Sequence, residues 1–405
     1  MAVNNTFLTT QLISNTALAM FAVNSPFIRT ASRNYQAEFS DTGYKIGSAI
    51  NIRRQVQYVV GDGSTATSQA VVETQETLTI NHQYHVMIEY DMVDLTLKIQ
   101  DFSQIFLQPA IQNIVAQMEA DIGTAAEQQL YLYTGTAGTP INSYAAVDRA
   151  GTKLLEMGVD MSGDVYQAMS IRDAAALKAS FPNGFTPVTN EQIVRKSALG
   201  HVSYFDLFQS QQIKRHTAGA GPTTYASDTL TVSGAVGSGN TIVLTGATIS
   251  VTNYFLPGDL ITVAGVNSVN PVGRQDTGQN MQFVITAAAN SDGSGNVSIT
   301  VAPAIISDLS NPLRNVTNAI PNGAAVTTVG SHNVNVAYIP RAIDIVCPPL
   351  AKLQVPFWSR AMDPKTKLSL TLTQAGDIVA YKNLMRLDIL CGFLWHPQYA
   401  ERNIS

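Results

Sequence analysis

The sequence predicts an α+β protein that carries an inserted all-β barrel. Residues 221–331 contain no Lys or Glu, and short runs rich in β-branched residues alternate there with Gly, Asn, Asp and Pro clusters. This pattern is typical of a small β-barrel or sandwich. The flanking segments have helical and strand periodicities that can complete a domain only by pairing across this block. The predicted barrel strands are 229–233, 241–245, 260–264, 282–286, 297–301 and 325–329.

Length and charge narrow the class of protein. The 405 residues are enough for two or three domains. Only 13% of them are charged, against roughly 25% in a typical soluble domain, which indicates that partners cover much of the surface. The net charge of −5 argues against a general nucleic-acid binder, because phosphate binding needs a local excess of Lys and Arg. These values equally suit a wall that encloses DNA without gripping it.

Residues 1–49 are predicted to form an N-terminal arm. Apolar residues that include Leu12 and Phe21 recur at helical spacing until Pro26 ends the run. This stripe is either ordinary core or a surface that docks on a neighbouring molecule. The first residues lack the pattern of a signal peptide, and no apolar stretch reaches the ~18 residues that span a bilayer. We therefore expect a protein that is made and kept in a cytosol.

Residues 50–77 are predicted to form an extended hairpin. Alternating residues from 52 to 60 lead into the turn at 61–64, and a return strand runs through 78–88. A lone two-stranded arm is marginal in water, so it needs another surface to lie on. The candidate intersubunit residues are Arg53, Arg54, Tyr58, Asp62, Leu12 and Phe21. For Arg53 and Arg54, the alternative is that they are solvated strand charges worth ~0–1 kcal/mol.

The remaining periodicities predict the host domain. A long helix is expected over 101–133, with Pro109 kinking or restarting it near its first turn. A helix over 145–157, a strand over 165–169 and a helix that begins at Ser170 should follow. After the barrel, we expect strands at 333–346 and 368–373, and an apolar segment at 377–393 that closes the domain.

No motif in the sequence predicts catalysis or cofactor binding. His82 and His85 are three apart on a predicted strand, so they face opposite sides and cannot chelate one ion. Cys347 and Cys391 match no metal-binding spacing and are expected to be reduced core thiols. The sequence contains no G-x-S-x-G, HExxH or P-loop pattern. We therefore expect no catalytic, cofactor-binding or metal site.

Three stretches, at 204–210, 255–266 and 373–400, together with the order of the elements, resemble the major coat proteins of tailed double-stranded DNA phages. The likeness is greatest to the P22-like branch, in which an HK97-like core carries an insertion domain. It covers most of the chain as architecture, although each motif is short. The resemblance implies an N-terminal arm at 1–49, an extended loop at 50–77, a peripheral domain with its spine helix at 78–140, an axial domain beginning at 141–220, an inserted barrel at 221–331 and returning segments at 332–405.

The resemblance also implies a function without enzymatic activity. The chain would be a major capsid protein that assembles into pentamers and hexamers around the phage DNA, without specific DNA binding, in the cytoplasm of a host bacterium. The implied partners are copies of itself, a scaffolding protein and a portal at one vertex, with a decoration protein left open; no membrane is involved.

Two features of the sequence limit what can be carried over from relatives. Some crosslink a Lys of the extended loop to a neighbour, but no Lys lies between Lys45 and Lys98. Burial, hydrogen bonds and sheet augmentation should therefore hold the shell. Relatives of this branch often carry a long acidic loop between the first two barrel strands, where this chain has a short neutral turn at 234–240.

Two other classes of protein compete with a phage capsid. An encapsulin-like nanocompartment would use the same core around a cargo enzyme, but such shells generally lack a large inserted barrel. A carbohydrate-binding or tail-adhesin module would need a surface cluster of aromatic residues. The predicted barrel has few aromatic residues, namely Tyr225, Tyr254, Phe255 and Phe283.

Overall fold

A computed structural model describes residues 26–35, 49–64, 68–91, 108–180, 200–355, 357–362, 367–377 and 382–405. The chain divides into two compact units. Unit 1 comprises 1–52, 76–122 and 343–394, and unit 2 comprises 53–75, 123–342 and 395–405. The predicted N-terminal arm lies mostly outside the described residues, and its described part includes the short helix α2 (Pro26–Thr30).

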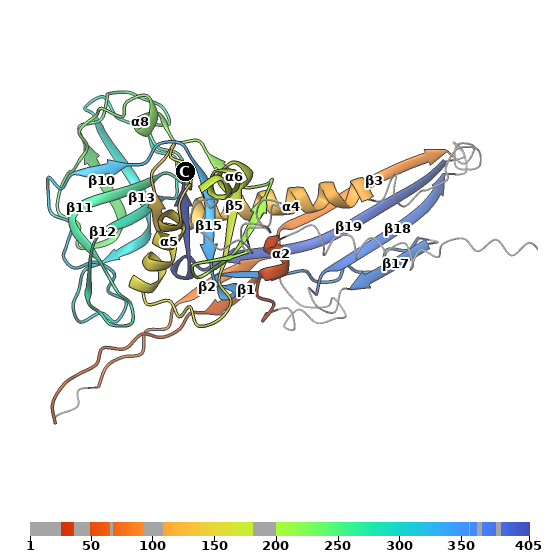
Figure 1. Cartoon of the computed structure of the whole chain (residues 1–405), viewed down its shortest axis with the longest axis horizontal. Coiled ribbons are helices and arrows are strands. Elements are labelled where there is room, and N and C mark those ends of the chain that lie inside the picture. Colours follow the sequence, from red (N-terminus) through yellow and green to blue (C-terminus); the bar gives the residue numbers. More distant parts are fainter. Residues whose placement is uncertain are drawn as a thin grey trace, which may run out of the picture. The chain divides into compact units, whose positions relative to one another are not determined.

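Unit 1 is built on a five-stranded sheet made of segments from both ends of the chain. The order is β16-β19-β18-β17, and β3 also pairs with β19. Figure 1 shows β3, β19, β18 and β17 as long strands that run together. Cys347 and Cys391 are buried in this unit and do not form a disulfide with each other, which agrees with the expected reduced core thiols. The strands are β3 (His82–Asp91), β16 (Ile343–Val346), β17 (Phe357–Met362), β18 (Ser369–Asp377) and β19 (Lys382–Trp395).

The long helix α4 (Gln108–Gln129) is shorter than the sequence predicts. Residues 101–107 lie outside the described residues, and Pro109 sits in the first turn, where its missing N–H is tolerated. The predicted end at Tyr133 is wrong, because Tyr133 begins β4 (Tyr133–Gly135), which pairs in parallel with a distant strand. The apolar stripe of α4 is buried, and Asp121 accepts a hydrogen bond from the Tyr84 hydroxyl of β3 at 2.7 Å.

The predicted hairpin is replaced by a short ladder. Strands β1 (Ala49–Arg53) and β2 (Gln75–Thr79) pair with each other. The predicted return strand is wrong as a single strand, because β3 begins separately at His82 and pairs with β19 over residues 382–391. Side chains of β3 alternate between half-buried and exposed, as predicted. The apolar pattern thus identifies the strand, whereas its partner lies about three hundred residues away and leaves no local signal.

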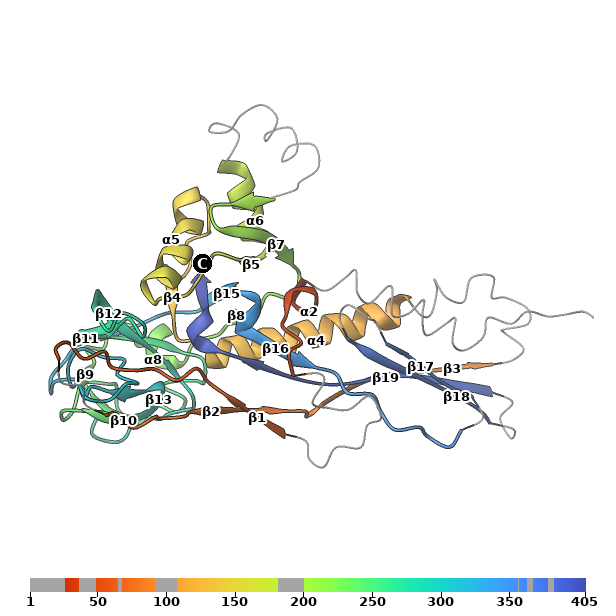
Figure 2. The same cartoon turned by 90° about the horizontal axis from the view of Figure 1, so that it is seen from below.

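The host sheet of unit 2 has seven strands. Its order is β4-β20-β15-β5-β7-β6, with β8 (Arg215–His216) paired to β15. Helices α5 (Tyr144–Glu156) and α6 (Ile171–Ser180) lie beside β5 and β7 (Figure 2). Both begin as predicted, with Ser143 and Ser170 accepting the cap hydrogen bonds. The remaining strands are β5 (Tyr166–Ser170), β6 (His201–Val202), β7 (Phe205–Ser210), β15 (His332–Tyr338) and β20 (Ala400–Ile404).

Strand β20, which lies between β4 and β15, is buried along its whole length although its sequence is AERNI. Sequence patterns did not predict it, because two charged residues in five residues indicate a surface segment. Gly135 of β4 has φ of +95° and lies so close to Ile404 that a Cβ there would be 2.3 Å from the Ile404 carbonyl oxygen. This approach lets β4 pair with β20.

Glu401 on β20 is expected to destabilise the fold at neutral pH. Its carboxyl is fully buried, Oε1 accepts the Thr134 hydroxyl at 3.0 Å, and Oε2 has no hydrogen-bond partner among the described residues. Burial raises the pKa of Glu401 well above its ordinary value, and the Thr134 hydrogen bond and Lys153 offset only part of this. The folded state therefore prefers the protonated acid, so the contribution of Glu401 to stability is greatest below its unfolded pKa and is lost as pH rises above it.

The substitution Glu401→Gln should therefore raise the free energy of unfolding at pH 7 by about 1–3 kcal/mol, because a neutral amide needs no buried charge. Urea unfolding between pH 4 and pH 8 measures this, and the fall in stability with rising pH should become smaller in the variant. Glu73→Gln, at an exposed acid, is the matched control and should change stability by less than about 0.5 kcal/mol. A loss of stability in Glu401→Gln at pH 7 would contradict the assignment.

The inserted block forms a closed barrel, as predicted. Its six strands follow the order β14-β11-β12-β13-β10-β9. Hydrogen bonds from Val232 N–H to Ala324 O and from Val326 N–H to Leu230 O, both 2.9 Å, join the first and last strands. Phe283, Ile299 and neighbouring apolar residues fill the interior. The strands are β9 (Thr231–Val232), β10 (Ser238–Thr245), β11 (Leu260–Val269), β12 (Asp276–Ile285), β13 (Asn296–Ile306) and β14 (Val326–Thr328).

Candidate subunit interface

The segment between β1 and β2, residues 54–74 without 65–67, is here called the extended loop. Its two arms run beside each other to a tip (Figure 1). Arg54 N–H donates to Thr74 O at 2.9 Å, and the Gln69 side chain bonds both the N–H and the carbonyl of Val59. Side chains thus replace the strand ladder here, so the arms stay paired without a regular hairpin.

The extended loop exposes apolar side chains. Val60 is 91% exposed, Val71 is 58% exposed and Tyr58 is 55% exposed. Isolated exposed apolar residues are common, but three of them on one projecting segment indicate a surface that another molecule covers. The extended loop therefore has the composition of an interface.

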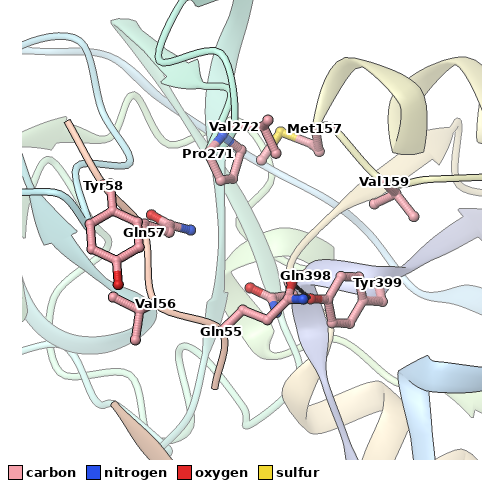
Figure 3. Close-up of a pocket in the computed structure, with 11 residues that line it drawn as sticks. Gln55, Val56, Gln57, Tyr58, Met157, Val159, Pro271, Val272, Gln398 and Tyr399 are labelled. Atoms are coloured by element: carbon pink, nitrogen blue, oxygen red, sulfur yellow. Dashed lines mark hydrogen bonds between the residues drawn. The ribbon is translucent and has the colours of Figure 1, made fainter. Parts of the chain in front are cut away.

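A groove of about 240 Å³ lies at the base of the extended loop. Figure 3 shows residues 55–58 along one side of it, Val272 and Met157 on another, and Gln398 with Tyr399 on a third. The Tyr399 hydroxyl donates to Gln55 Oε1 at 3.2 Å, which ties the loop to the segment before β20.

Arg54 lies at the base of the extended loop, and its side chain is half-buried. Burial lowers its pKa, while the neighbouring Tyr131 and Tyr399 raise it in part. Burial also raises the pKa of Tyr131 to about 12, so Tyr131 remains a neutral phenol at physiological pH. Arg54 and Tyr131 also line a second groove, of about 370 Å³, that reaches barrel residues 302–306 and 313–315.

The six candidate intersubunit residues predicted from the sequence lie in several different places. Arg53 Nη1 lies 3.6 Å from Glu73 Oε2 of the opposite arm, and both side chains are exposed. Asp62 is exposed in the turn near the tip. Tyr58 lines the first groove, and Arg54 lines the second. The arm candidates Leu12 and Phe21 lie outside the described residues.

Sequence reasoning missed Gln398 and Tyr399. Both residues belong to the short 3₁₀ helix Pro397–Tyr399, and only the fold brings them to the same groove as residues 55–58. Among the described residues, no group of three or more His, Cys, Asp or Glu side chains could hold a metal ion. The helices within the described ranges are all too short or too polar to cross a membrane.

One family model matches nearly the whole of this chain. The family model described as P22 coat protein, gene protein 5, matches residues 1–399. A curated relative, the major capsid protein of Acyrthosiphon pisum secondary endosymbiont phage 1, is 22% identical over 374 residues, which cover 86% of each protein.

Solved structures similar to this chain include phage capsid proteins. The Mycobacterium phage Che8 chain has 10% identity and a TM-score of 0.49, with 93% of this chain and 90% of that chain covered. The mature capsid of bacteriophage PhiM1 has 10% identity and a TM-score of 0.44, covering 94% and 87%. The CUS-3 coat protein I-domain has 26% identity and a TM-score of 0.18, covering 25% of this chain and 96% of that domain.

Proposed function

The chain belongs to the P22 coat protein family and is a phage major capsid protein, and we propose that it assembles into pentamers and hexamers that form the icosahedral head around the phage DNA. The observation that carries this proposal is the family match over residues 1–399, which includes the inserted barrel. The same match favours a phage head over an encapsulin-like compartment. It also favours a structural role over a carbohydrate-binding module or an enzyme.

The extended loop is proposed as the main contact between neighbouring subunits. Its exposed Tyr58, Val60 and Val71 would bury apolar area on the adjacent copy, with Arg53 and Asp62 at the rim. A head-to-tail contact of this kind closes into rings when its rotation closes. Each contact can be weak, because many contacts act together in a closed shell.

The domain assignment belongs to the same proposal. Residues 1–49 serve as the arm, and 50–77 form the extended loop. The peripheral domain is 78–140, the axial domain begins at 141–220, the barrel spans 221–331, and 332–405 complete both host domains. The ladders of β3 with β19 and of β5 with β15 support this division, because each pairs a strand before the barrel with a strand after it.

The proposed partners are those of a phage head that assembles first and then encloses the DNA. They are other copies of the chain, a scaffolding protein, a portal at one vertex and a decoration protein as an open option. Assembly takes place in the cytoplasm of the host bacterium. The net charge of −5 supports enclosure of DNA without specific binding.

Electron microscopy of the purified protein tests the proposal. The full chain is expressed with a scaffolding-protein candidate from the same phage genome and separated by size. We expect closed shells of uniform diameter, with fivefold and sixfold clusters of subunits visible in class averages. Small monodisperse oligomers under every condition of salt, pH and scaffold would contradict it.

A further inference from the structure

A buried cluster of charged side chains lies where the barrel joins the host sheet of unit 2. His216 of β8 is at its centre, with its side chain 1% exposed. Its Nδ1 lies 2.6 Å from Glu127 Oε1 at the end of α4, and its Nε2 lies 2.7 Å from Asp259 Oδ1 at the start of β11. The Asp259 side chain is fully buried. One imidazole ring thus connects the long helix to the barrel.

This geometry favours a doubly protonated ring. A neutral imidazole donates from one nitrogen only, whereas here both ring nitrogens face carboxyl oxygens. Burial is the largest single influence on the pKa of His216 and lowers it. The hydrogen bonds to Asp259 and Glu127 together outweigh burial, and the net effect raises the pKa of His216. The contacts therefore stabilise the imidazolium form of His216.

The same carboxylate holds the chain where it enters the barrel. Asp259 accepts the Gly219 N–H at 3.2 Å and the Leu256 N–H at 2.7 Å. Arg402 of β20 completes the cluster, because its guanidinium donates to the carbonyl of Gly258 and to the carbonyl of Glu127. The cluster therefore joins α4, β8 and β20 to Gly219, where the chain approaches the barrel, and to residues 256–259, which precede β11.

The charges in the cluster balance. His216 and Arg402 carry two positive charges, and Glu127 and Asp259 carry two negative charges. The ring of His332 on β15 lies 5.2 Å from that of His216, and its Nδ1 faces Gly330 O at 2.8 Å. Burial lowers the pKa of His332 to about 3, and the nearby Arg402 and His216 lower it further. The hydrogen bond with Gly330 raises this pKa and offsets only part of the effect. On β8 itself, Arg215 points to solvent.

We propose that Glu127, His216, Asp259 and Arg402 form a proton-dependent latch that fixes the inserted barrel on the host sheet. Removal of the His216 proton would leave two buried carboxylates facing one donor, with a net negative charge that water cannot screen. The latch is then weakened, and the segments at 217–221 and 255–259 open more often. The proposal concerns the isolated subunit and does not depend on shell assembly.

The direction of the pH dependence follows from the raised pKa. When the latch opens, His216 returns to its ordinary pKa near 6.5, so the latch is fully closed below about pH 6.5. Above that pH, the equilibrium shifts toward opening by about tenfold per pH unit until the folded-state pKa is reached. Burial lowers the pKa of Arg402 to about 9, so above about pH 9 Arg402 opposes this trend, because the closed state then binds fewer protons than the open state.

Hydrogen exchange of the full-length, wild-type subunit, purified before it assembles, tests the latch. Exchange of peptides covering 217–221 and 255–259 is followed by mass spectrometry from pH 6 to pH 9 and divided by the intrinsic rate at each pH. We expect the protection factor to fall by at least tenfold over this range, while peptides of the barrel strand at 296–306 change by less than about threefold. Equal protection at both pH limits would overturn the proposal.

Two variants separate the latch from general alkaline loosening. His216→Gln should make protection of these peptides low and independent of pH. His201→Gln, at an exposed histidine whose Nδ1 lies 3.0 Å from Asp206, is the matched control and should behave like the wild type. If His216→Gln does not fold, nitrogen NMR of the wild-type ring decides the question. Both ring nitrogens should be protonated at pH 7, and a neutral ring there would overturn the latch.

Discussion

Deletion of residues 56–72 is expected to abolish particle formation while leaving the subunit folded. These residues carry the exposed apolar side chains of the extended loop and contribute little to either core. The ladder between β1 and β2 and the bond from Arg54 N–H to Thr74 O can remain when a short Gly-Ser turn replaces them. Because a shell repeats each contact many times, loss of one contact type prevents closure.

The measurements separate assembly from folding. Particle yield after co-expression with scaffold should fall by more than about 100-fold, as expected when a multivalent contact is lost. The free energy of unfolding of the subunit should change by less than about 1 kcal/mol, since exposed segments contribute little. Val60→Asp should reproduce the assembly defect, and Asp62→Asn, a similarly exposed neighbour, is the control. Normal particle yield from the deletion would remove the role assigned to the extended loop.

Asp259→Ala is expected to cause the largest loss of stability of any single substitution described above. The Asp259 side chain is fully buried and accepts hydrogen bonds from His216, Gly219 and Leu256. Its removal leaves the His216 ring with only one of its two carboxyl partners and takes away the acceptor of two backbone N–H groups, those of Gly219 and Leu256. Breaking a buried ion pair in this way costs about 3–5 kcal/mol.

Urea unfolding of the monomeric subunit, followed by tryptophan fluorescence and circular dichroism, measures this loss. Asp292→Ala is the control, because Asp292 is an exposed turn residue whose oxygens bond Ser294 and Asn296 within the same barrel. Its loss should cost about 1 kcal/mol. Similar losses for the two variants would show that the buried cluster does not stabilise the junction.

Several elements could be predicted from the sequence because their signal is local. The weakly charged β-branched block predicted all six barrel strands, and the helices predicted over 145–157 and from Ser170 are found as α5 and α6. The predicted fold class, an α+β HK97-like capsid fold with an inserted β-barrel, is confirmed, as is membership of the coat protein family.

Other elements could not be predicted because their stability comes from distant residues. The strand at 82–91 looked like half of a hairpin, yet it pairs with 382–391, since hydrogen-bonding partners leave no trace in local periodicity. Strand β20 carries Glu401 and Arg402, which are typical of a surface segment, yet it is a buried interior strand of the host sheet. The grooves beside residues 55–58 depend on Gln398 and Tyr399 in the same way.

The sequence by itself determined the barrel, its place in the chain and the amphipathic elements around it. These follow from side-chain period, turn chemistry and charge, which act over a few residues. Only the tertiary structure decided which strands pair across the barrel and which charged residues are buried together. The cluster of Glu127, His216, Asp259 and Arg402 exists only after folding, because the buried, water-free setting that makes its charges interact strongly is created by packing.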